Sequence, residues 1–352
     1  MIPPSVSVVT TVCDGELFLA QAIESVLGQS FTDFEYLIVD DASTDSSAEI
    51  MHTYAAQDSR IVVMRNNSRL GPSGTLNRAL HAARGMFLAN LDQDDLAMPE
   101  RLALQTAFLK CQPSVGVVGS YVRWLDADGQ VTASIRYPVV PRQIRWELLF
   151  RGCVVHSAAM MRRDLLLRSG GYSLDHPYAC DYELWTRLIQ TTEFANIAEY
   201  LAAYRITEAQ TSRTQRKSQQ GQIVLLMHAA LFRTLGVRIP LQQVNNLYWG
   251  IRQRTFSNEA EVSQTAELLG NIMHMYLEKV SPDTATVTTV RESCAVKMFR
   301  LAWHHRELSS GLYDRLLEKA VQFDARLLSN SEVTELLGAD HDSGCGSHSL
   351  RQ

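Results

Sequence analysis

The alternation of apolar runs with helical segments over the first hundred residues constrains the fold more than any other feature. The apolar runs are rich in β-branched and aromatic residues, as buried strands are, and the segments between them carry apolar residues at helical spacing. The predicted strands are residues 6–12, 34–43, 60–66 and 86–91, and the predicted helices are residues 16–29, 43–57 and 73–85. This order predicts a Rossmann-like α/β fold, with right-handed crossovers and helices on both faces of the sheet.

The pattern changes twice along the rest of the chain. Two further strands are expected around the turn at residues 126–130, and another at residues 195–206, which makes the sheet mixed. From residue 214 onward the apolar periodicity is helical. We therefore expect an α/β domain over residues 1–213, an all-helical domain over 214–338 and a disordered tail over 339–352.

Composition excludes several classes of protein. The formal net charge of −5 provides no basic field for nucleic acid, and no apolar run reaches the roughly 18 residues that a transmembrane helix needs. Six scattered cysteines without a C-x-x-C pair indicate a reducing compartment, not a disulfide framework or a zinc site. We expect a cytoplasmic protein without a signal peptide that does not bind nucleic acid.

Polar residues follow each of the four early strands. The fourth strand ends in three carboxylates within four residues, Asp92, Asp94 and Asp95. Because the carboxyl ends of parallel strands meet at one edge of a sheet, a shared site is expected there. Clustered carboxylates repel one another unless a cation compensates, and Mg²⁺ and Mn²⁺ prefer carboxylate ligands and bridge to phosphates. The D-x-D spacing therefore predicts a divalent-metal site, with a solvated turn that caps the next helix as the alternative.

The chain resembles the family 2 glycosyltransferases, which have the GT-A fold. Close similarity covers about the first hundred residues and rests on "VSVVTTVCDGELFLAQAIESVLGQ", "FEYLIVDDASTD", "SGTLNRALHAARG" and "LDQDDLAMPERL". Looser similarity continues to about residue 212 through "HSAAMMRR", "GGY", "DYELWTRL" and "YRITEAQTS". It does not extend into the C-terminal helical region. The resemblance implies that the chain transfers a sugar from a nucleotide donor.

The resemblance implies a nucleotide pocket at the ends of the early strands. Thr11 falls where the first strand meets the nucleotide, and Asp41 falls where a carboxylate accepts the N3–H of uracil. The neighbouring Asp40 has loop capping as its alternative role. Asn77 matches a position that lines the pocket, although a helix-surface amide is the other interpretation.

The resemblance also implies roles for the acids. Asp92 corresponds to the acid near the ribose and the sugar, Asp94 to the ligand of Mg²⁺ or Mn²⁺ on the diphosphate, and Asp95 to a residue that supports the loop. Asp181 matches the general base that takes the proton of the acceptor hydroxyl, with a helix N-cap as the alternative. Cys180 stands where the family often has an acid.

Two further residues match family positions. His156 in "VVHSAAMMRR" corresponds to a recurrent histidine near the sugar or diphosphate, and a satisfied core histidine is the alternative. Arg205 in "YRITEAQTS" is expected to reach the diphosphate or to order a loop over it. Thr207 stands where the family often has a histidine.

These residues predict an inverting, metal-dependent, non-processive glycosyltransferase. It would move one sugar, with UDP as the expected carrier, to a glycan or lipid-linked acceptor in cell-surface polysaccharide or glycolipid biosynthesis. The alternatives are a catalytically inactive sugar-nucleotide-binding or scaffold protein and a sugar-phosphate nucleotidyltransferase, although no Gly-rich basic loop follows the first strand. The C-terminal helices are expected to form their own core or a homodimer interface, with peripheral contact on the inner face of the membrane as the alternative.

Overall fold

The computed structural model describes residues 3–208, 210, 214–280 and 282–342. The chain forms two compact units, residues 1–226 and 227–352, and the division falls within helix α9 (Arg216–Leu235). Most of the expected tail, residues 343–352, lies outside the described residues.

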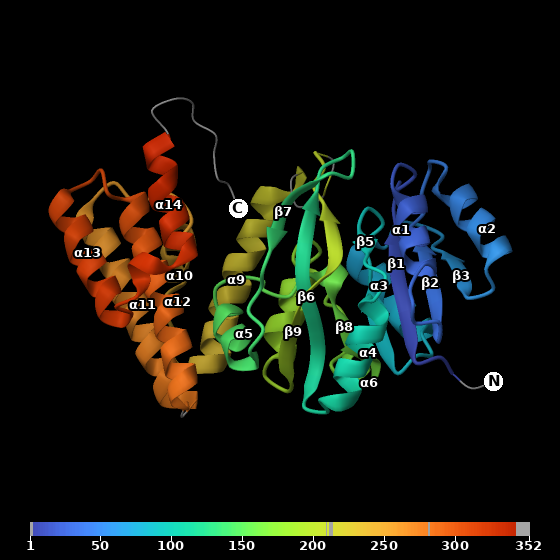
Figure 1. Ribbon diagram of the computed structural model, residues 1–352, viewed down its shortest axis with the longest axis horizontal. Helices are drawn as coiled ribbons and strands as arrows, with labels where there is room; N and C mark the ends of the chain where they lie inside the picture. The colour runs from blue at the N-terminus through green and yellow to red at the C-terminus, as the bar shows by residue number, and fades with distance from the viewer. Residues whose placement is uncertain (1–2, 209, 211–213, 281, 343–352) are drawn as a thin grey trace. The chain divides into compact units, whose positions relative to one another are not determined.

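Within the described residues, unit 1 is built on a nine-stranded mixed sheet in the order β3-β2-β1-β4-β8-β6-β9-β5, with β7 paired to β6 (Figure 1). The strands are β1 (Val6–Val12), β2 (Phe34–Asp40), β3 (Ile61–Arg65), β4 (Phe87–Asn90), β5 (Leu96–Ala97), β6 (Val115–Leu125), β7 (Val131–Ile135), β8 (Met160–Arg162) and β9 (Glu193–Arg205). The first four are parallel to one another, as the alternating pattern predicts. The two-residue β5 was not predicted, because so short a strand has no periodicity of its own.

Helices cover both faces of this sheet. They are α1 (Leu19–Leu27), α2 (Ser47–Gln57), α3 (Gly71–Ala82), α4 (Arg101–Cys111), α5 (Pro141–Glu147), α6 (Arg163–Arg168) and α7 (Cys180–Leu188), with a 3₁₀ turn η1 (His156–Ala158). Side chains of α1, α2 and α4 share one hydrophobic core with the sheet, and those of α3, α5, α6 and α7 share the other. The strands are buried on both faces because alternate side chains enter the two cores, Val8 on one side and Val9 on the other.

The direction of the strands decides where a site can form. Strand β8 is antiparallel to both β4 and β6, and β6 is parallel to β9. Strands β4, β6 and β9 therefore run the same way as β1, β2 and β3. Their carboxyl ends all open at one edge of the sheet, which we call the catalytic edge.

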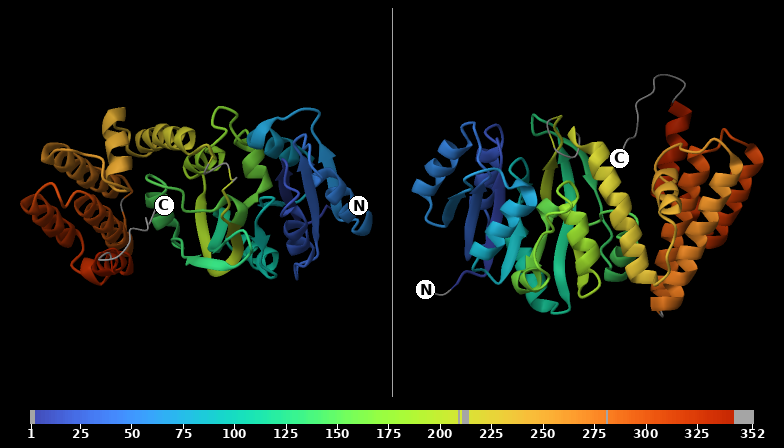
Figure 2. Two further views of the ribbon diagram at one scale, coloured as in Figure 1. Left: turned by 90° about the horizontal axis from the view of Figure 1, so that it is seen from above. Right: turned by 180° about the vertical axis from the view of Figure 1, so that it is seen from behind.

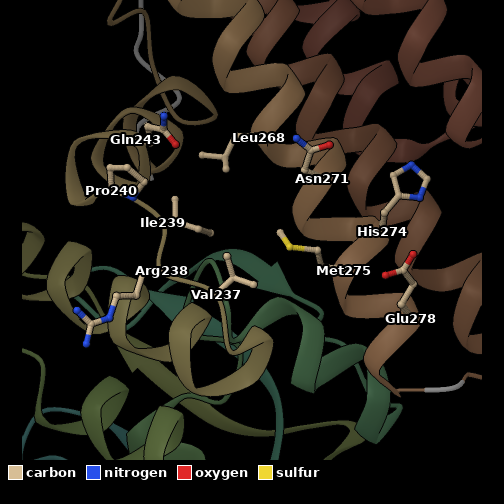
Figure 3. A pocket seen from close by; sticks show the side chains of 10 residues that line it. All are labelled: Val237, Arg238, Ile239, Pro240, Gln243, Leu268, Asn271, His274, Met275 and Glu278. Carbon is tan, nitrogen blue, oxygen red and sulfur yellow. The ribbon is translucent and has the colours of Figure 1, made fainter.

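Unit 2 is helical where it is described (Figure 2). Its helices are α10 (Leu241–Gly250), α11 (Glu259–Val280), α12 (Thr284–His304), α13 (Ser310–Phe323) and α14 (Ser331–Asp342), with a 3₁₀ turn η2 (Leu327–Ser329). The Asp283 carboxylate caps α12 and the Ser309 hydroxyl caps α13 by accepting backbone N–H groups. A hollow of about 380 Å³ lies between residues 237–243 and one face of α11 (Figure 3). None of the described helices is long and apolar enough to span a membrane.

Gly85 supports a specific stability prediction. A Cβ there would lie 2.4 Å from the backbone nitrogen of Ser7, which cannot move without disturbing β1. Gly85→Ala should therefore lower the free energy of unfolding by about 1–3 kcal/mol. Chemical denaturation measures the change, with Gly221→Ala as the control. A Cβ added at Gly221 in α9 would meet no neighbouring atom within 4 Å. Gly221→Ala should therefore stabilise the protein by about 0.5–1 kcal/mol. Equal unfolding curves for the two variants would contradict the packing described.

Candidate active site

The loop after β4 carries three acids and is held from two sides. Gln93 connects it to the end of β1, because its Oε1 accepts the backbone N–H of Cys13 at 2.8 Å. The hydroxyl of Ser157 accepts the backbone N–H of Asp92 at 2.9 Å. The side chains of Asp92 and Asp94 are partly exposed, whereas Asp95 is fully buried. The loop thus presents two carboxylates and buries the third.

Two buried arginines lie beneath this loop. Arg205 on β9 donates from Nε to the Asp94 carbonyl at 3.0 Å and from its backbone N–H to Asp95 Oδ1 at 2.8 Å. Its other guanidinium nitrogens donate to Gln21 and to the carbonyls of residues 126 and 127. Arg101 on α4 donates to the Asn90 carbonyl at 2.7 Å. Arg205 is only 1% exposed, and its hydrogen bonds hold the loop from below.

The acids of the loop are difficult to ionise together. Burial, and then the neighbouring Asp92 carboxylate, raise the pKa of Asp94 to about 6. Burial, and then Asp94 and Asp92, raise the pKa of Asp95 well above its usual range. A cation near the two exposed carboxylates would relieve this repulsion.

His156 connects the acidic loop to α7. Its Nδ1 lies 3.6 Å from Asp92 Oδ1, and its Nε2 lies 2.7 Å from Asn90 Nδ2 and 3.0 Å from the Tyr172 hydroxyl. These contacts fix the plane of the ring. Burial lowers the pKa of His156, but the carboxylates of Asp92 and Asp181 outweigh it and hold that pKa above its usual value.

Asp181 lies in the first turn of α7, which packs on the same face of the sheet as α3, α5 and α6. Its Oδ1 accepts the backbone N–H of Tyr182 at 2.7 Å. The alternative role of Asp181 as the helix N-cap is wrong, because Ala179 occupies that position and α7 has no side-chain capping bond. Burial raises the pKa of Asp181, and the charge of His156 partly offsets this. Its neighbour Cys180 is partly buried, and the loss of solvent raises the pKa of that thiol to about 12 and keeps it protonated. Asp92, His156 and Asp181 therefore meet at the catalytic edge.

Asn77 and Asp41 make contacts that their local sequence does not indicate. Asn77 on α3 clamps the backbone of Tyr172: its amide donates to the Tyr172 carbonyl and accepts the Tyr172 N–H, each at 2.8 Å. Asp41 Oδ1 accepts from Asn66 and from the backbone N–H of Leu70, each at 2.7 Å, and its Oδ2 accepts from Gly71 at 2.9 Å. Asp41 thus holds the start of α3, and Oδ2 keeps capacity for one more donor.

Thr11 lies half-buried near the end of β1, opposite Val39 of β2 in register. The polar network also includes Asn90 and Tyr172, which sequence reasoning missed. Asn90 interrupts an apolar strand, and Tyr172 follows the Gly170-Gly171 pair, so both carried a local signal. What the sequence could not show is that β4 and this glycine turn meet at His156.

The loop fits a divalent cation of the kind that the D-x-D spacing predicts. No group of three or more His, Cys, Asp and Glu side chains forms a ready-made metal cluster in the part of the chain that the structure describes. Mg²⁺ and Mn²⁺ at phosphate sites take one or two protein carboxylates and complete their shell with phosphate and water. Asp94 and Asp92 offer such a pair, and among the described residues the hydrogen bond to Asp94 Oδ2 is a long one, 3.3 Å from Gln210 Nε2.

Comparison with known proteins decides the family. The sequence profile described as Glycosyl transferase family 2 matches residues 7–169. EpsE of Bacillus subtilis, which its name places among the glycosyltransferases, is 35% identical over 191 residues, covering 53% of this chain and 67% of EpsE. The chain belongs to glycosyltransferase family 2.

Other relatives of this glycosyltransferase carry more specific names. The Escherichia coli protein named UDP-Glc:alpha-D-GlcNAc-diphosphoundecaprenol beta-1,3-glucosyltransferase WfaP is 24% identical over 232 residues, covering 65% of this chain and 86% of WfaP. S. aureus TarS 1-349 in complex with UDP-GlcNAc has a TM-score of 0.55 at 16% identity, over 90% of this chain and 92% of that one. The Pyrobaculum calidifontis mannosyltransferase PcManGT with GDP-Man and Mn²⁺ has a TM-score of 0.54 at 17% identity, over 93% and 88%. These structures show that the enzyme has the GT-A fold.

The raised pKa of Asp94 leads to a stability prediction for the metal-free enzyme. The folded-state pKa of about 6 exceeds the ordinary value of 3.8, so the ionised form destabilises the fold, and stability is lost as the pH rises from about 4 to 6. Asp94→Asn cannot ionise and should be more stable by roughly 1–3 kcal/mol at pH 8, with a gap that narrows towards pH 4. Thermal unfolding of both proteins in the presence of EDTA, over this pH range, measures the difference in stability.

The control for this prediction is Asp164→Asn on α6. The Asp164 side chain is 64% exposed and pairs with Arg168 in solvent. The Tm of Asp164→Asn should therefore differ little from that of the wild type at any pH. A gap between the wild type and Asp94→Asn that is independent of pH would show that ionisation of Asp94 is not its cause.

Proposed function

We propose that this family 2 enzyme is an inverting, metal-dependent, non-processive glycosyltransferase. It moves one sugar from a nucleoside-diphosphate donor, with UDP as the carrier, to a hydroxyl of a glycan or lipid-linked acceptor. The UDP-sugar and lipid-linked glycan in the name of WfaP, and the bound UDP-GlcNAc of TarS, support this choice of donor and acceptor. Use in cell-surface polysaccharide biosynthesis is part of the same proposal.

One observation carries the proposal: a carboxylate suited to act as a base lies beside the acidic loop. His156 contacts Asp92 at 3.6 Å, and the negative charges of Asp92 and Asp181 both raise its pKa. Asp181 is thus within electrostatic reach of the acids expected to hold the donor. Its burial raises its pKa and with it the proton affinity of the carboxylate, which favours proton abstraction.

The roles of the residues follow from these positions. Asp181 accepts the proton of the acceptor hydroxyl as that oxygen attacks the anomeric carbon, in one displacement that inverts the configuration. Asp92 and His156 orient the donor sugar, and Thr11 and Asp41 contact the nucleotide. Asn77 holds the backbone beside Tyr172, and Arg205 with Asp95 supports the loop from below. A single displacement requires no second nucleophile on the protein.

The metal part of the proposal concerns Asp94, with Asp92 nearby. A bound Mg²⁺ or Mn²⁺ supplies positive charge that stabilises the departing nucleoside diphosphate. The Mn²⁺ in the PcManGT structure supports this choice. Asp94 must be ionised to bind the cation, and its pKa of about 6 allows that at neutral pH.

Release of nucleotide tests the function. The purified enzyme is incubated with UDP-sugars or GDP-mannose and Mn²⁺, with and without saccharide acceptors, and the nucleoside diphosphate released is measured. We expect release from a UDP-sugar that is faster with an acceptor and is abolished by EDTA. Tight binding of a UDP-sugar without release under any condition would support the inactive binding protein instead.

Asp181→Asn should lower the turnover number by roughly 10²–10⁴-fold, because the amide cannot accept a proton. Donor affinity, measured by calorimetry with UDP-sugar and Mn²⁺, should change far less. Glu193→Gln is the control, since Glu193 lies at the amino end of β9, away from the catalytic edge, and pairs with Ser114. Near-normal turnover of Asp181→Asn would show that Asp181 is not the general base.

A further inference from the structure

Aromatic side chains gather at the carboxyl ends of β6 and β9. Trp124 and Tyr204 are register neighbours on these two strands, and both are half-buried. They pack, together with Tyr137 and Val155, over a small buried cluster of Val122, Ala158 and Ala202. We call Trp124, Tyr204, Tyr137 and Val155 the aromatic platform. The buried cluster beneath it is distinct from the two large cores that hold the helices on the sheet, and Tyr137 packs against both this cluster and one of those cores.

The aromatic platform adjoins the catalytic edge at three points. Val155 directly precedes His156, so the turn that carries the histidine also carries part of the platform. Tyr137 packs both against the buried cluster under the platform and against the core that α7 shares, and Asp181 lies in the first turn of α7. Tyr204 directly precedes Arg205, whose backbone N–H binds Asp95.

The platform combines uncharged rings with links to the elements that carry His156 and the proposed base, through Val155 and Tyr137. A sugar ring has a face of C–H groups and an edge of hydroxyls. Its C–H face packs well on an aromatic ring, and this packing leaves the hydroxyls free to be oriented. A glycosyl transfer needs a second substrate within reach of the base, and the donor side of the edge is already formed by β1, β2 and β4.

We propose that the aromatic platform is the acceptor subsite, and that the acceptor is a saccharide whose ring stacks on Trp124 and Tyr204. Stacking there directs one hydroxyl of the ring towards Asp181. This inference rests on the proposed function, because it assumes that Asp181 serves an acceptor hydroxyl. It adds the chemical class of the group that the enzyme recognises next to the base, and the residues that recognise it.

The other face of β6 provides a matched control. Side chains alternate across a strand, so Arg123 lies on the opposite face from Val122 and Trp124. Arg123 stacks over Tyr200 at 5.6 Å, and Tyr121 pairs with Tyr200 at 5.5 Å between ring centroids. Tyr121→Ala thus removes a half-buried aromatic residue from the same strand without touching the platform.

Binding of simple glycosides tests the inference without requiring turnover. Saturation-transfer difference NMR is recorded on the enzyme with UDP and Mn²⁺, using methyl glycosides of glucose, galactose, mannose and N-acetylglucosamine, and octyl β-glucoside. We expect saturation of ring protons by the wild type. The affinity should fall roughly tenfold or more in Trp124→Ala and Tyr204→Ala, recover largely in Trp124→Phe, and stay unchanged in Tyr121→Ala. Thermal unfolding of each variant confirms that it is folded.

Three results would overturn the acceptor subsite. One is wild-type affinity in both alanine variants, another is binding of none of these glycosides to the wild type, and the third is saturation confined to the octyl chain, which indicates a lipid surface. Nucleotide release in the same samples tests the transferase separately. Turnover with platform-independent binding refutes only the subsite, whereas platform-dependent binding with no release from any donor refutes only the transfer.

Discussion

The structure depends on two buried arginines whose guanidinium groups bind the backbone of an acidic loop instead of its carboxylates. Arg101 and Arg205 are each 1% exposed, and both donate to main-chain carbonyls at the ends of the loop, Asn90 and Asp94. A buried cation is costly unless nearby negative charge compensates it. Burial lowers the pKa of Arg101 to about 10, and Asp95 and Asp92 oppose that change. The cations therefore need the acids, and the two guanidinium groups leave the carboxylates of Asp92 and Asp94 available.

This arrangement leaves an excess of negative charge on the acidic loop. The divalent cation of the proposed donor complex would compensate that charge. Asp94 and Asp95 both have raised pKa values, with burial as the first cause and the neighbouring acids as the second. A fold selected only for stability would not place three carboxylates within four residues at a strand end. The strain is confined to one loop, and the sheet below it is apolar on both faces. Functional sites commonly concentrate unfavourable interactions in this way.

Local pattern was enough to predict the α/β framework of unit 1, and the family resemblance added the GT-A fold, but neither predicted the contacts inside the site. Strand β1 was predicted to the residue, because β-branched residues in a buried parallel strand leave a clear signal. Asn77 could only be described as a pocket residue or a surface amide, since its partner Tyr172 lies 95 residues away. Arg205 was predicted to reach the diphosphate or to order a loop over it. Its hydrogen-bond partners include Gln21, which lies 184 residues away in the sequence. No local periodicity encodes such pairs.

Strand β8 explains why the two halves of unit 1 can act on one reaction. It has only three residues, Met160–Arg162, but it is antiparallel to β4 on one side and to β6 on the other. Two reversals restore the direction, so β6 ends at the same edge as β4. A single antiparallel step would have turned β6 around and carried Trp124 to the opposite edge from Asp92. The turn that leads into β8 also carries His156, so the element that aligns the two halves delivers the residue that connects them.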